Sequence, residues 1–238
     1  MDLKTSHESH RAVTAQPAVE TAAAPRAIVK YVVEAIGTFF LVFTVGAAVG
    51  SGSTLAPLAI GAVLMVMVYA GGHISGGHYN PAVTLAALVR RRIGPADALG
   101  YWIAQLIAGM VAAEVVHRVV HPVQAAITTT TLSGQILLAA FVVELLFTFA
   151  LCYVVLNVAT SKDHPKNSFY GLAIGFTVVA GAVAVGGISG GAFNPAVTIG
   201  AAVMNMFAWQ TLWVYLVAQV IAGAAAGATF LALNPNDK

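Results

Sequence analysis

A stretch of eleven residues occurs twice in this chain and constrains its fold more than any other feature. The first copy, ISGGHYNPAVT, begins at Ile74, and the second, ISGGAFNPAVT, begins at Ile188, 114 residues later. Only two of the eleven positions differ between the copies. A fixed offset over this distance indicates an internal duplication. We therefore expect two copies of one structural unit.

Each copy predicts a short helix that begins at its proline. Asn is a preferred N-cap residue, and Pro is tolerated in the first helical turn because its missing N–H is not needed there. Asn80 and Asn194 are thus predicted to cap helices over about 81–90 and 195–205. About ten residues rise only about 15 Å, half of the hydrocarbon core of a bilayer. We predict two half-helices, with ordinary interhelical turns as the alternative.

Long uncharged stretches indicate a multi-pass membrane protein. Of the 238 residues, 59% are hydrophobic and 8% charged, and no charged residue lies between Glu34 and Arg90 or between Lys166 and Asp237. Such runs predict spans within the lipid bilayer rather than a soluble domain, and no nucleic-acid partner is expected. The six candidate spans are roughly 28–50, 57–73, 96–119, 134–159, 169–187 and 209–232. The predicted fold class is an all-α membrane protein with six transmembrane helices and two re-entrant half-helices.

Three spans in each copy predict that the two copies are inverted in the membrane. Because three is odd, the second copy enters the bilayer upside down, an arrangement known in transport proteins. All eleven Lys and Arg residues except Arg118 fall on one side of this topology. Both termini are therefore expected in the cytoplasm. The run Arg90–Arg92 is then mainly a topology signal, with binding of anionic lipid as the alternative.

The glycine-rich stretches before the half-helices predict a pore. Non-helical backbone is stable at membrane depth only where it is buried in protein or lines water. Half-helices that enter from opposite faces bring Asn80 and Asn194 together, with their amide NH₂ groups as donors toward the lumen. Both positive helix N-termini point at the same place and repel cations. The predicted pore-lining backbone comprises Gly76, Gly77, His78, Tyr79, Gly190, Ala192 and Phe193.

Two acidic residues inside spans are predicted to be structural. Glu34 and Glu144 each follow Val-Val in the first span of a copy. An ionisable side chain inside a span is costly and is usually paired or functional. Its natural partners here are the free backbone N–H groups of the loops that enter the half-helices, with a proton relay as the alternative. His73 and His78 are expected to be neutral and hydrogen-bonded, with gating by protonation as the alternative.

The duplicated motifs resemble those of the aquaporin, or major intrinsic protein, family. The run from His73 to Thr84 is similar to the first family motif, and the two triplets Asn80-Pro81-Ala82 and Asn194-Pro195-Ala196 resemble the paired Asn-Pro-Ala signature. The resemblance covers about residues 28–232. It implies six spans, two half-helices, a pore in every subunit and a homotetramer.

One departure from the family pattern concerns the pore constriction. Most of the family has Arg after the second Asn-Pro-Ala, and this chain has Val197. The other constriction positions that the resemblance implies are Ile60, Ala182 and Gly191. This set has no ring and no charge, and it resembles plant tonoplast-type aquaporins. Thr198 stands where glycerol facilitators usually have Asp, which argues against that subfamily.

These observations predict passive permeation of water and other small neutral solutes, such as ammonia, hydrogen peroxide or urea, with exclusion of ions and protons. The alternatives are a channel mainly for glycerol or another neutral solute, and an ion-coupled transporter, which would need acidic groups at the membrane midplane. We expect no catalytic residue, metal or cofactor, because His73, His78 and Cys152 form no such constellation by spacing. The protein is expected in the cell membrane, plasma or inner.

The expected domain organisation follows the duplication. Residues 1–26 are polar, lack the apolar core of a signal peptide, and are predicted to be a disordered cytoplasmic tail. Residues 27–232 form the aquaporin-like channel domain, with repeat one over about 28–120 and repeat two over about 134–232. Residues 233–238 are expected to be a second cytoplasmic tail. The single Cys152 lies in an apolar run, so no disulfide forms within one chain.

Overall fold

The regular structure of this chain is helical. The computed structural model describes residues 25–120 and 132–237, and within these ranges no strand is present. Six helices are long and apolar enough to span a membrane, counting the short helical turns that continue two of them. They are α1 (Ala27–Gly50), α2 (Ala56–Ser75), α4 (Pro95–Val115), α5 (Gly134–Thr160), α6 (Tyr170–Ser189) and α8 (Leu212–Leu233). The predicted all-α membrane fold is confirmed.

The two predicted half-helices are α3 (Pro81–Val89) and α7 (Pro195–Val203). Each begins at the proline, and the preceding asparagine caps it in an extended conformation. The Asn80 Oδ1 accepts the Ala82 N–H at 2.8 Å, and the Asn194 Oδ1 accepts the Ala196 N–H at 2.9 Å. These bonds satisfy backbone donors that would otherwise lack partners at a helix N-terminus inside the membrane.

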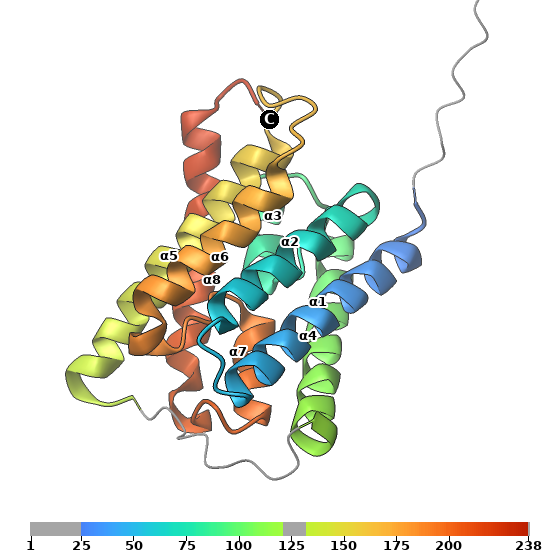
Figure 1. Cartoon of the computed structure of the whole chain (residues 1–238). Coiled ribbons are helices and arrows are strands. Elements are labelled where there is room, and N and C mark those ends of the chain that lie inside the picture. The colour runs from blue at the N-terminus through green and yellow to red at the C-terminus, as the bar shows by residue number, and fades with distance from the viewer. Residues whose placement is uncertain (1–24, 121–131, 238) are drawn as a thin grey trace, which may run out of the picture.

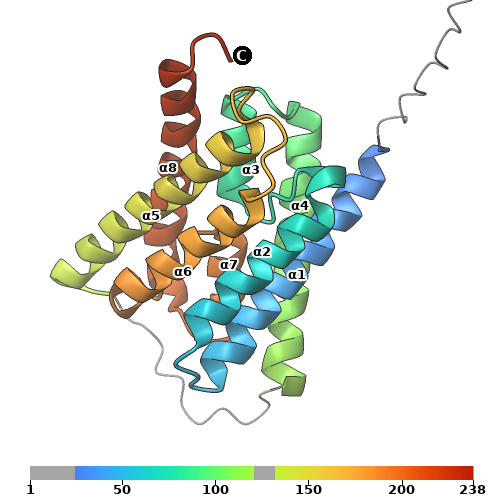
Figure 2. The ribbon, with the colours of Figure 1, turned by 45° about the horizontal axis from the view of Figure 1, so that its top comes forward.

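The two repeats interlock rather than sit side by side as separate units. Helices α1 and α4 pack together in repeat one, as α5 and α8 do in repeat two, and α2 crosses α6 between the repeats (Figures 1 and 2). Each half-helix packs against the last long helix of the other repeat, α3 on α8 and α7 on α4. Neither repeat therefore completes its own packing without the other.

The crossing of α2 and α6 depends on glycine. A Cβ atom on Gly61 would lie 2.5 Å from the carbonyl oxygen of Gly175, and a Cβ on Gly175 would lie 2.4 Å from the carbonyl oxygen of Gly61. Any side chain at either position would force the backbones apart. Small residues allow such close approach of helices in a membrane.

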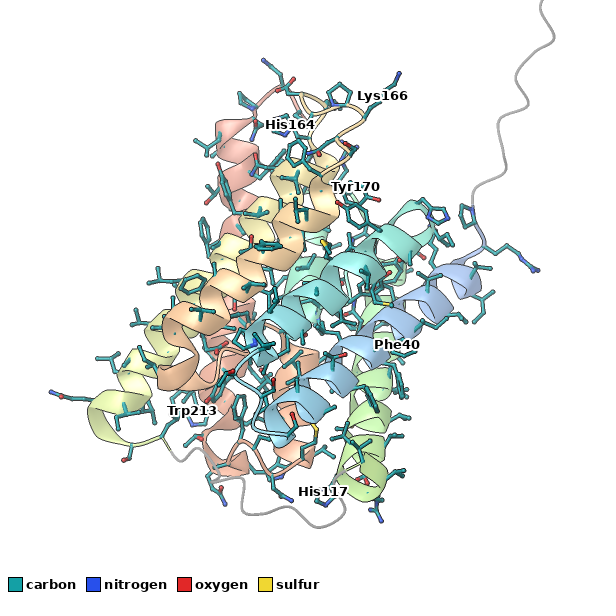
Figure 3. The ribbon with its side chains drawn as sticks, viewed as in Figure 1. Phe40, His117, His164, Lys166, Tyr170 and Trp213 are labelled. Carbon is teal, nitrogen blue, oxygen red and sulfur yellow. The ribbon has the colours of Figure 1, made fainter. Side chains whose placement is uncertain are left out.

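Positive charge gathers at one end of the molecule. His164 and Lys166 lie at the end opposite His117 (Figure 3). At the end that carries His164 and Lys166, Asp237 contacts Arg90, Arg92 and Lys162. Residues 1–24 of the predicted N-terminal tail lie outside the described residues. Within the predicted C-terminal tail, α8 ends at Leu233 and the Asp237 side chain is buried.

Candidate functional site

A cavity of about 350 Å³ runs between the two repeats. The side chains of Asn80 and Asn194 line it from the N-terminal ends of α3 and α7. Of the described residues that line this cavity, only His78 adds a further nitrogen- or oxygen-bearing side chain. Its walls are otherwise apolar or glycine, and they include the four predicted constriction residues Ile60, Ala182, Gly191 and Val197.

The two asparagines cross-link the repeats at the centre of the cavity. The Asn80 Nδ2 donates to the carbonyl oxygen of Phe193 at 2.9 Å, and the Asn194 Nδ2 donates to that of Tyr79 at 2.9 Å. Each asparagine amide thus donates one of its two N–H groups to a carbonyl of the loop in the other repeat. This differs from the expectation that the NH₂ group as a whole faces the lumen. Because an amide NH₂ has two hydrogens, one donor from each asparagine remains for the cavity.

An unusual backbone conformation aims these two carbonyl groups. Tyr79 and Phe193 both have φ 48, and the glycines Gly76, Gly77, Gly190 and Gly191 before them also have positive φ. Positive φ is common for glycine but rare for a bulky aromatic residue. Strained residues of this kind persist where surrounding contacts hold them, often at functional sites.

Buried carboxylates provide the contacts that hold these loops. In repeat one, the Glu34 Oε1 accepts the Ser75 hydroxyl at 2.7 Å and the His78 N–H at 2.9 Å. The Glu34 Oε2 accepts the Tyr79 N–H at 2.7 Å and the Gln105 Nε2 at 2.9 Å. The carboxylate therefore binds four donors, and two of them are backbone groups of the glycine-rich loop.

Repeat two forms the same set of bonds. The Glu144 Oε1 accepts the Ser189 hydroxyl at 2.8 Å and the Ala192 N–H at 2.9 Å. The Glu144 Oε2 accepts the Phe193 N–H at 2.8 Å and the Gln219 Nε2 at 3.0 Å. Both acids are fully buried. These contacts are those of a loop scaffold, and each acid has the partners that the sequence suggested for it.

Several supporting residues were not singled out from the sequence, although their spacing could have revealed them. Tyr101 and Tyr215 donate to the carbonyl oxygens of Ser75 and Ser189, at 2.5 and 2.6 Å. Gln105 and Gln219 donate to the hydroxyls of Thr84 and Thr198, at 3.0 and 2.9 Å. All of these pairs, including the two serines, share the offset of 114 residues that relates the two motifs.

The predicted pore-lining backbone divides into two groups. Gly77, His78, Gly190 and Ala192 line the cavity that contains the two asparagines, and Gly76 and His78 line a second cavity of about 490 Å³. Tyr79 and Phe193 are absent from the described lining of both, since both side chains are buried behind the wall. Their carbonyl groups instead bind the asparagines. His73 lies in the last turn of α2 and is likewise absent from the described lining.

A buried ion pair holds the far end of the first half-helix. Arg90, the C-cap of α3, is fully buried, and its Nη2 lies 2.7 Å from the Asp237 Oδ1. The guanidinium also lies over the Phe230 ring, 4.1 Å from its centroid, and donates to Thr160. Burial works against ionisation of Asp237, but hydrogen bonds from the Lys162 N–H and from Arg90 hold the pKa of its carboxyl below its usual range.

Comparisons with known proteins agree on one family. The profile of the family described as "Major intrinsic protein" matches residues 19–231. The chain is 44% identical over 199 residues to "Glycerol uptake facilitator protein-like 6" of Lactiplantibacillus plantarum, covering 79% of this chain and 90% of that protein. It is 39% identical over 226 residues to "Aquaporin NIP2-1" of Oryza sativa subsp. japonica, covering 90% of this chain and 74% of that protein.

A solved structure has a similar fold. The aquaglyceroporin from Plasmodium falciparum superposes with a TM-score of 0.76, covering 86% of this chain and 96% of that chain. The two sequences are 22% identical, so this similarity concerns the fold alone.

Proposed function

The chain belongs to the major intrinsic protein family, whose members are membrane channels rather than enzymes, and we propose that it conducts water and other small uncharged solutes while excluding ions and protons. One observation carries the proposal. Asn80 and Asn194, at the N-termini of two half-helices from opposite repeats, line the same cavity, whose described lining is otherwise apolar or glycine except for His78. Such a site offers hydrogen-bond donors to a neutral solute and no anionic group to a cation.

Exclusion of charge follows from the half-helices. Each helix N-terminus carries roughly half a positive charge, and α3 and α7 direct theirs toward the same region of the cavity. The second N–H of each amide, on Asn80 and on Asn194, is the donor that we assign to the oxygen of a water passing between them. A water that accepts both bonds has its own hydrogens directed away along the pore, so it relays no proton at that point. The positive potential adds a barrier to hydronium.

The constriction supports passage of solutes larger than water. Ile60, Ala182, Gly191 and Val197 have no charge and line the cavity, and by the family resemblance Val197 stands where most members have an arginine. Ammonia, hydrogen peroxide and urea are neutral and small, and none requires a fixed cation for passage. The resemblance of this set to tonoplast-type aquaporins rests on these four residues alone.

A channel mainly for glycerol is the second candidate. The relative from L. plantarum is named for glycerol uptake, and it is the more similar of the two relatives described above. The apolar wall of the cavity suits the carbon side of a polyol, while the asparagine amides suit its hydroxyl groups. Thr198, in place of the Asp of glycerol facilitators, is the residue that argues against this candidate.

The setting of the channel is also part of the proposal. We infer a homotetramer in the cell membrane, with both termini in the cytoplasm. The positive-inside rule supports this orientation, because Arg90, Arg92 and Lys162 gather at the end that carries the C-terminus. Large apolar side chains exposed along α1 and α4, among them Ile36, Phe40, Ile103 and Ile107, provide a surface for lipid or neighbouring subunits.

Stopped-flow light scattering of proteoliposomes tests the proposal. Vesicles shrink under an impermeant osmolyte at a rate set by water flux, and re-swell at a rate set by entry of a permeant test solute. We expect faster water flux than in protein-free vesicles, and re-swelling in urea. Re-swelling in glycerol that is fast while water flux stays at the protein-free rate would favour the second candidate. Rates equal to those of protein-free vesicles for every solute would refute a channel for small neutral solutes.

A further inference from the structure

The structure divides the arginine run between α3 and α4 into two parts. Arg90 is fully buried and pairs with Asp237, whereas Arg91 and Arg92 are exposed. The two exposed arginines belong to a surface hollow of about 380 Å³, whose described lining is Leu88, Arg91, Arg92, Ile93, Gly94 and Pro95. The pairing with Asp237 thus accounts for the first arginine of the run, and the other two stand in a hollow on the surface.

The turn that carries these arginines has an uncharged counterpart in repeat two. Met204, Asn205 and Met206 stand 114 residues after the three arginines. Both runs close a half-helix with the same pair of backbone bonds, in which the second and third residues of the run donate to helix carbonyls three and five residues earlier. This is a common way for a helix to end. The turn itself therefore does not require arginine.

Arg91 occupies the least suitable position of this turn for an arginine. Its φ is 66, and that of the equivalent Asn205 is 59. The left-handed region favours glycine and tolerates asparagine, whereas a longer side chain is costly there. Arg91 holds a cation at this place against a backbone preference that asparagine would satisfy.

The hollow carries positive charge that the described residues do not neutralise. Arg91 forms no ion pair among them. Arg92 lies 3.7 Å from the Asp237 Oδ1, but that oxygen also lies 2.7 Å from Arg90 and 3.9 Å from Lys162. One carboxylate thus faces three cations, and no acidic side chain is part of the described lining of the hollow.

An apolar row leads from the hollow along the surface of α4. Pro95 lines the hollow, and Leu99, Ile103 and Ile107 follow it at intervals of four residues, which are neighbours on a helix surface. These three side chains are between 51% and 56% exposed. From Pro95 to Ile107 the helix rises about 18 Å, close to half of a hydrocarbon core of about 30 Å. The row therefore spans about the depth of one bilayer leaflet.

A second copy of this chain offers the hollow few acidic groups. Of the six described carboxylates, five are buried or already form an ion pair, namely Glu34, Glu144, Asp237, Asp97 and Glu114. Asp163 is the remaining described one. A bilayer leaflet, in contrast, presents phosphodiester groups directly beside acyl chains. A cationic hollow at the head of an apolar row matches that combination.

We propose that Arg91 and Arg92 bind the headgroup of one anionic phospholipid in each subunit, and that an acyl chain of this lipid lies along Leu99, Ile103 and Ile107. Guanidinium groups suit a phosphodiester because their planar sets of N–H donors match its oxygens. A zwitterionic headgroup binds more weakly, since its own cation is repelled by the two arginines. The site concerns the lipid around the channel and does not depend on which solutes the channel conducts.

Native mass spectrometry of the detergent-solubilised full chain tests the proposal, because each bound lipid adds its mass to the complex. Phosphatidylglycerol is compared with phosphatidylcholine that has the same acyl chains. We expect one tightly bound phosphatidylglycerol per subunit. Its affinity should exceed that of phosphatidylcholine by roughly 25-fold, about fivefold for each arginine.

Two matched substitutions separate a site from general attraction to a cationic surface. Arg91→Asn removes a cation and introduces the residue that repeat two carries at Asn205, so the turn is preserved. Lys166→Asn is the control, because Lys166 also is exposed and has a positive φ of 59, and it lies at the same end but outside the hollow. We expect Arg91→Asn to lower the affinity for phosphatidylglycerol about fivefold and Lys166→Asn to leave it unchanged.

An equal loss in Arg91→Asn and Lys166→Asn would overturn the proposal, since it would show a diffuse attraction of the whole cationic end. Equal affinity of the wild type for the two lipids would also overturn it. Displacement of the lipid when inorganic phosphate replaces chloride at constant ionic strength would make free phosphate the ligand instead. A changed number of subunits in Arg91→Asn, with lipid binding retained, would assign the hollow to a neighbouring subunit.

Arg92→Gln provides a second reading of the same site. Glutamine keeps an N–H donor for the Thr160 carbonyl that Arg92 binds, and it removes the charge. This variant should also lose about fivefold in affinity for phosphatidylglycerol. If Arg91→Asn folds poorly, the comparison of Arg92→Gln with Lys166→Asn decides the matter, and unchanged affinity in Arg92→Gln would overturn the site.

Discussion

Removal of the Glu144 carboxylate is the most informative single change to the loop scaffold. In Glu144→Ala, the backbone N–H groups of Ala192 and Phe193 lose their acceptor inside the protein. The other two donors are less affected, because the Ser189 hydroxyl can rotate toward another acceptor and Gln219 keeps its hydrogen bond to the Thr198 hydroxyl. A buried donor without a partner costs about 1–3 kcal/mol, so two such donors lower the free energy of unfolding by about 2–6 kcal/mol.

Glu144→Ala is also expected to alter the pore, because Glu144 binds the backbone N–H of Phe193. This residue has φ 48, and its carbonyl accepts the Asn80 amide of the other repeat. Without Glu144, the loop relaxes from that strained conformation and the asparagine cross-link loses its geometry. We therefore expect Glu144→Ala to lose water permeability together with stability. Glu34→Ala should behave in the same way, because Glu34 binds an equivalent set of donors.

The single cysteine offers a direct assay of unfolding. Cys152 is the only cysteine in the chain and is fully buried, so a thiol-reactive fluorescent dye labels it only as the protein opens. For a chain of this size, the expected loss of stability lowers the melting temperature by roughly 5–20 °C. Glu114→Ala is the matched control, since Glu114 forms an exposed ion pair with Arg118 on α4, and such pairs contribute little.

Two results would refute the scaffold role. The first is a melting temperature of Glu144→Ala that matches that of Glu114→Ala, with water permeability retained. The second is normal stability combined with altered proton flux, which would favour the proton relay instead. Glu144→Gln removes the negative charge but keeps one acceptor oxygen for the N–H groups of the loop. Its melting temperature should therefore lie between those of the wild type and Glu144→Ala.

Three further predictions concern the constriction, the central barrier and the C-terminus. Val197→Arg should reduce urea permeability more than water permeability in proteoliposomes, and an equal reduction of both would contradict a selective effect of that position. The wild type should pass water without measurable proton flux, read by an enclosed pH-sensitive dye with valinomycin present; a dye response well above that of protein-free vesicles would show the asparagine barrier to be insufficient. The pKa of Asp237 is lower in the folded protein than in the unfolded chain. The ionised carboxylate therefore stabilises the fold at any pH above the pKa of an unfolded aspartate, about 3.9. This stabilisation is lost as the pH falls through the lower pKa of the folded state. The melting temperature should therefore fall more on acidification in the wild type than in Asp237→Asn, and equal falls would contradict the role of the pair with Arg90.

Features set by neighbouring residues or by the duplication could be predicted from the sequence. Asn80 and Asn194 cap helices because Asn-Pro is a local N-terminal signal that needs no distant contact. The six spans follow from apolar length, and the inversion of the repeats follows from counting three spans in each. The acids Glu34 and Glu144 could be assigned to the loops because few other groups inside a bilayer can satisfy a buried carboxylate.

Other features depend on where distant segments meet, and only the tertiary structure decided them. The asparagine amides bind the carbonyls of Tyr79 and Phe193 because α3 and α7 each pack against the other repeat. Asp237, in the predicted cytoplasmic tail, is buried against Arg90, 147 residues away. His78 and Val155, which line both cavities, come from a loop and a helix of different repeats. Hydropathy and motif spacing describe each segment separately, whereas the width of a lumen is set by the distance between segments.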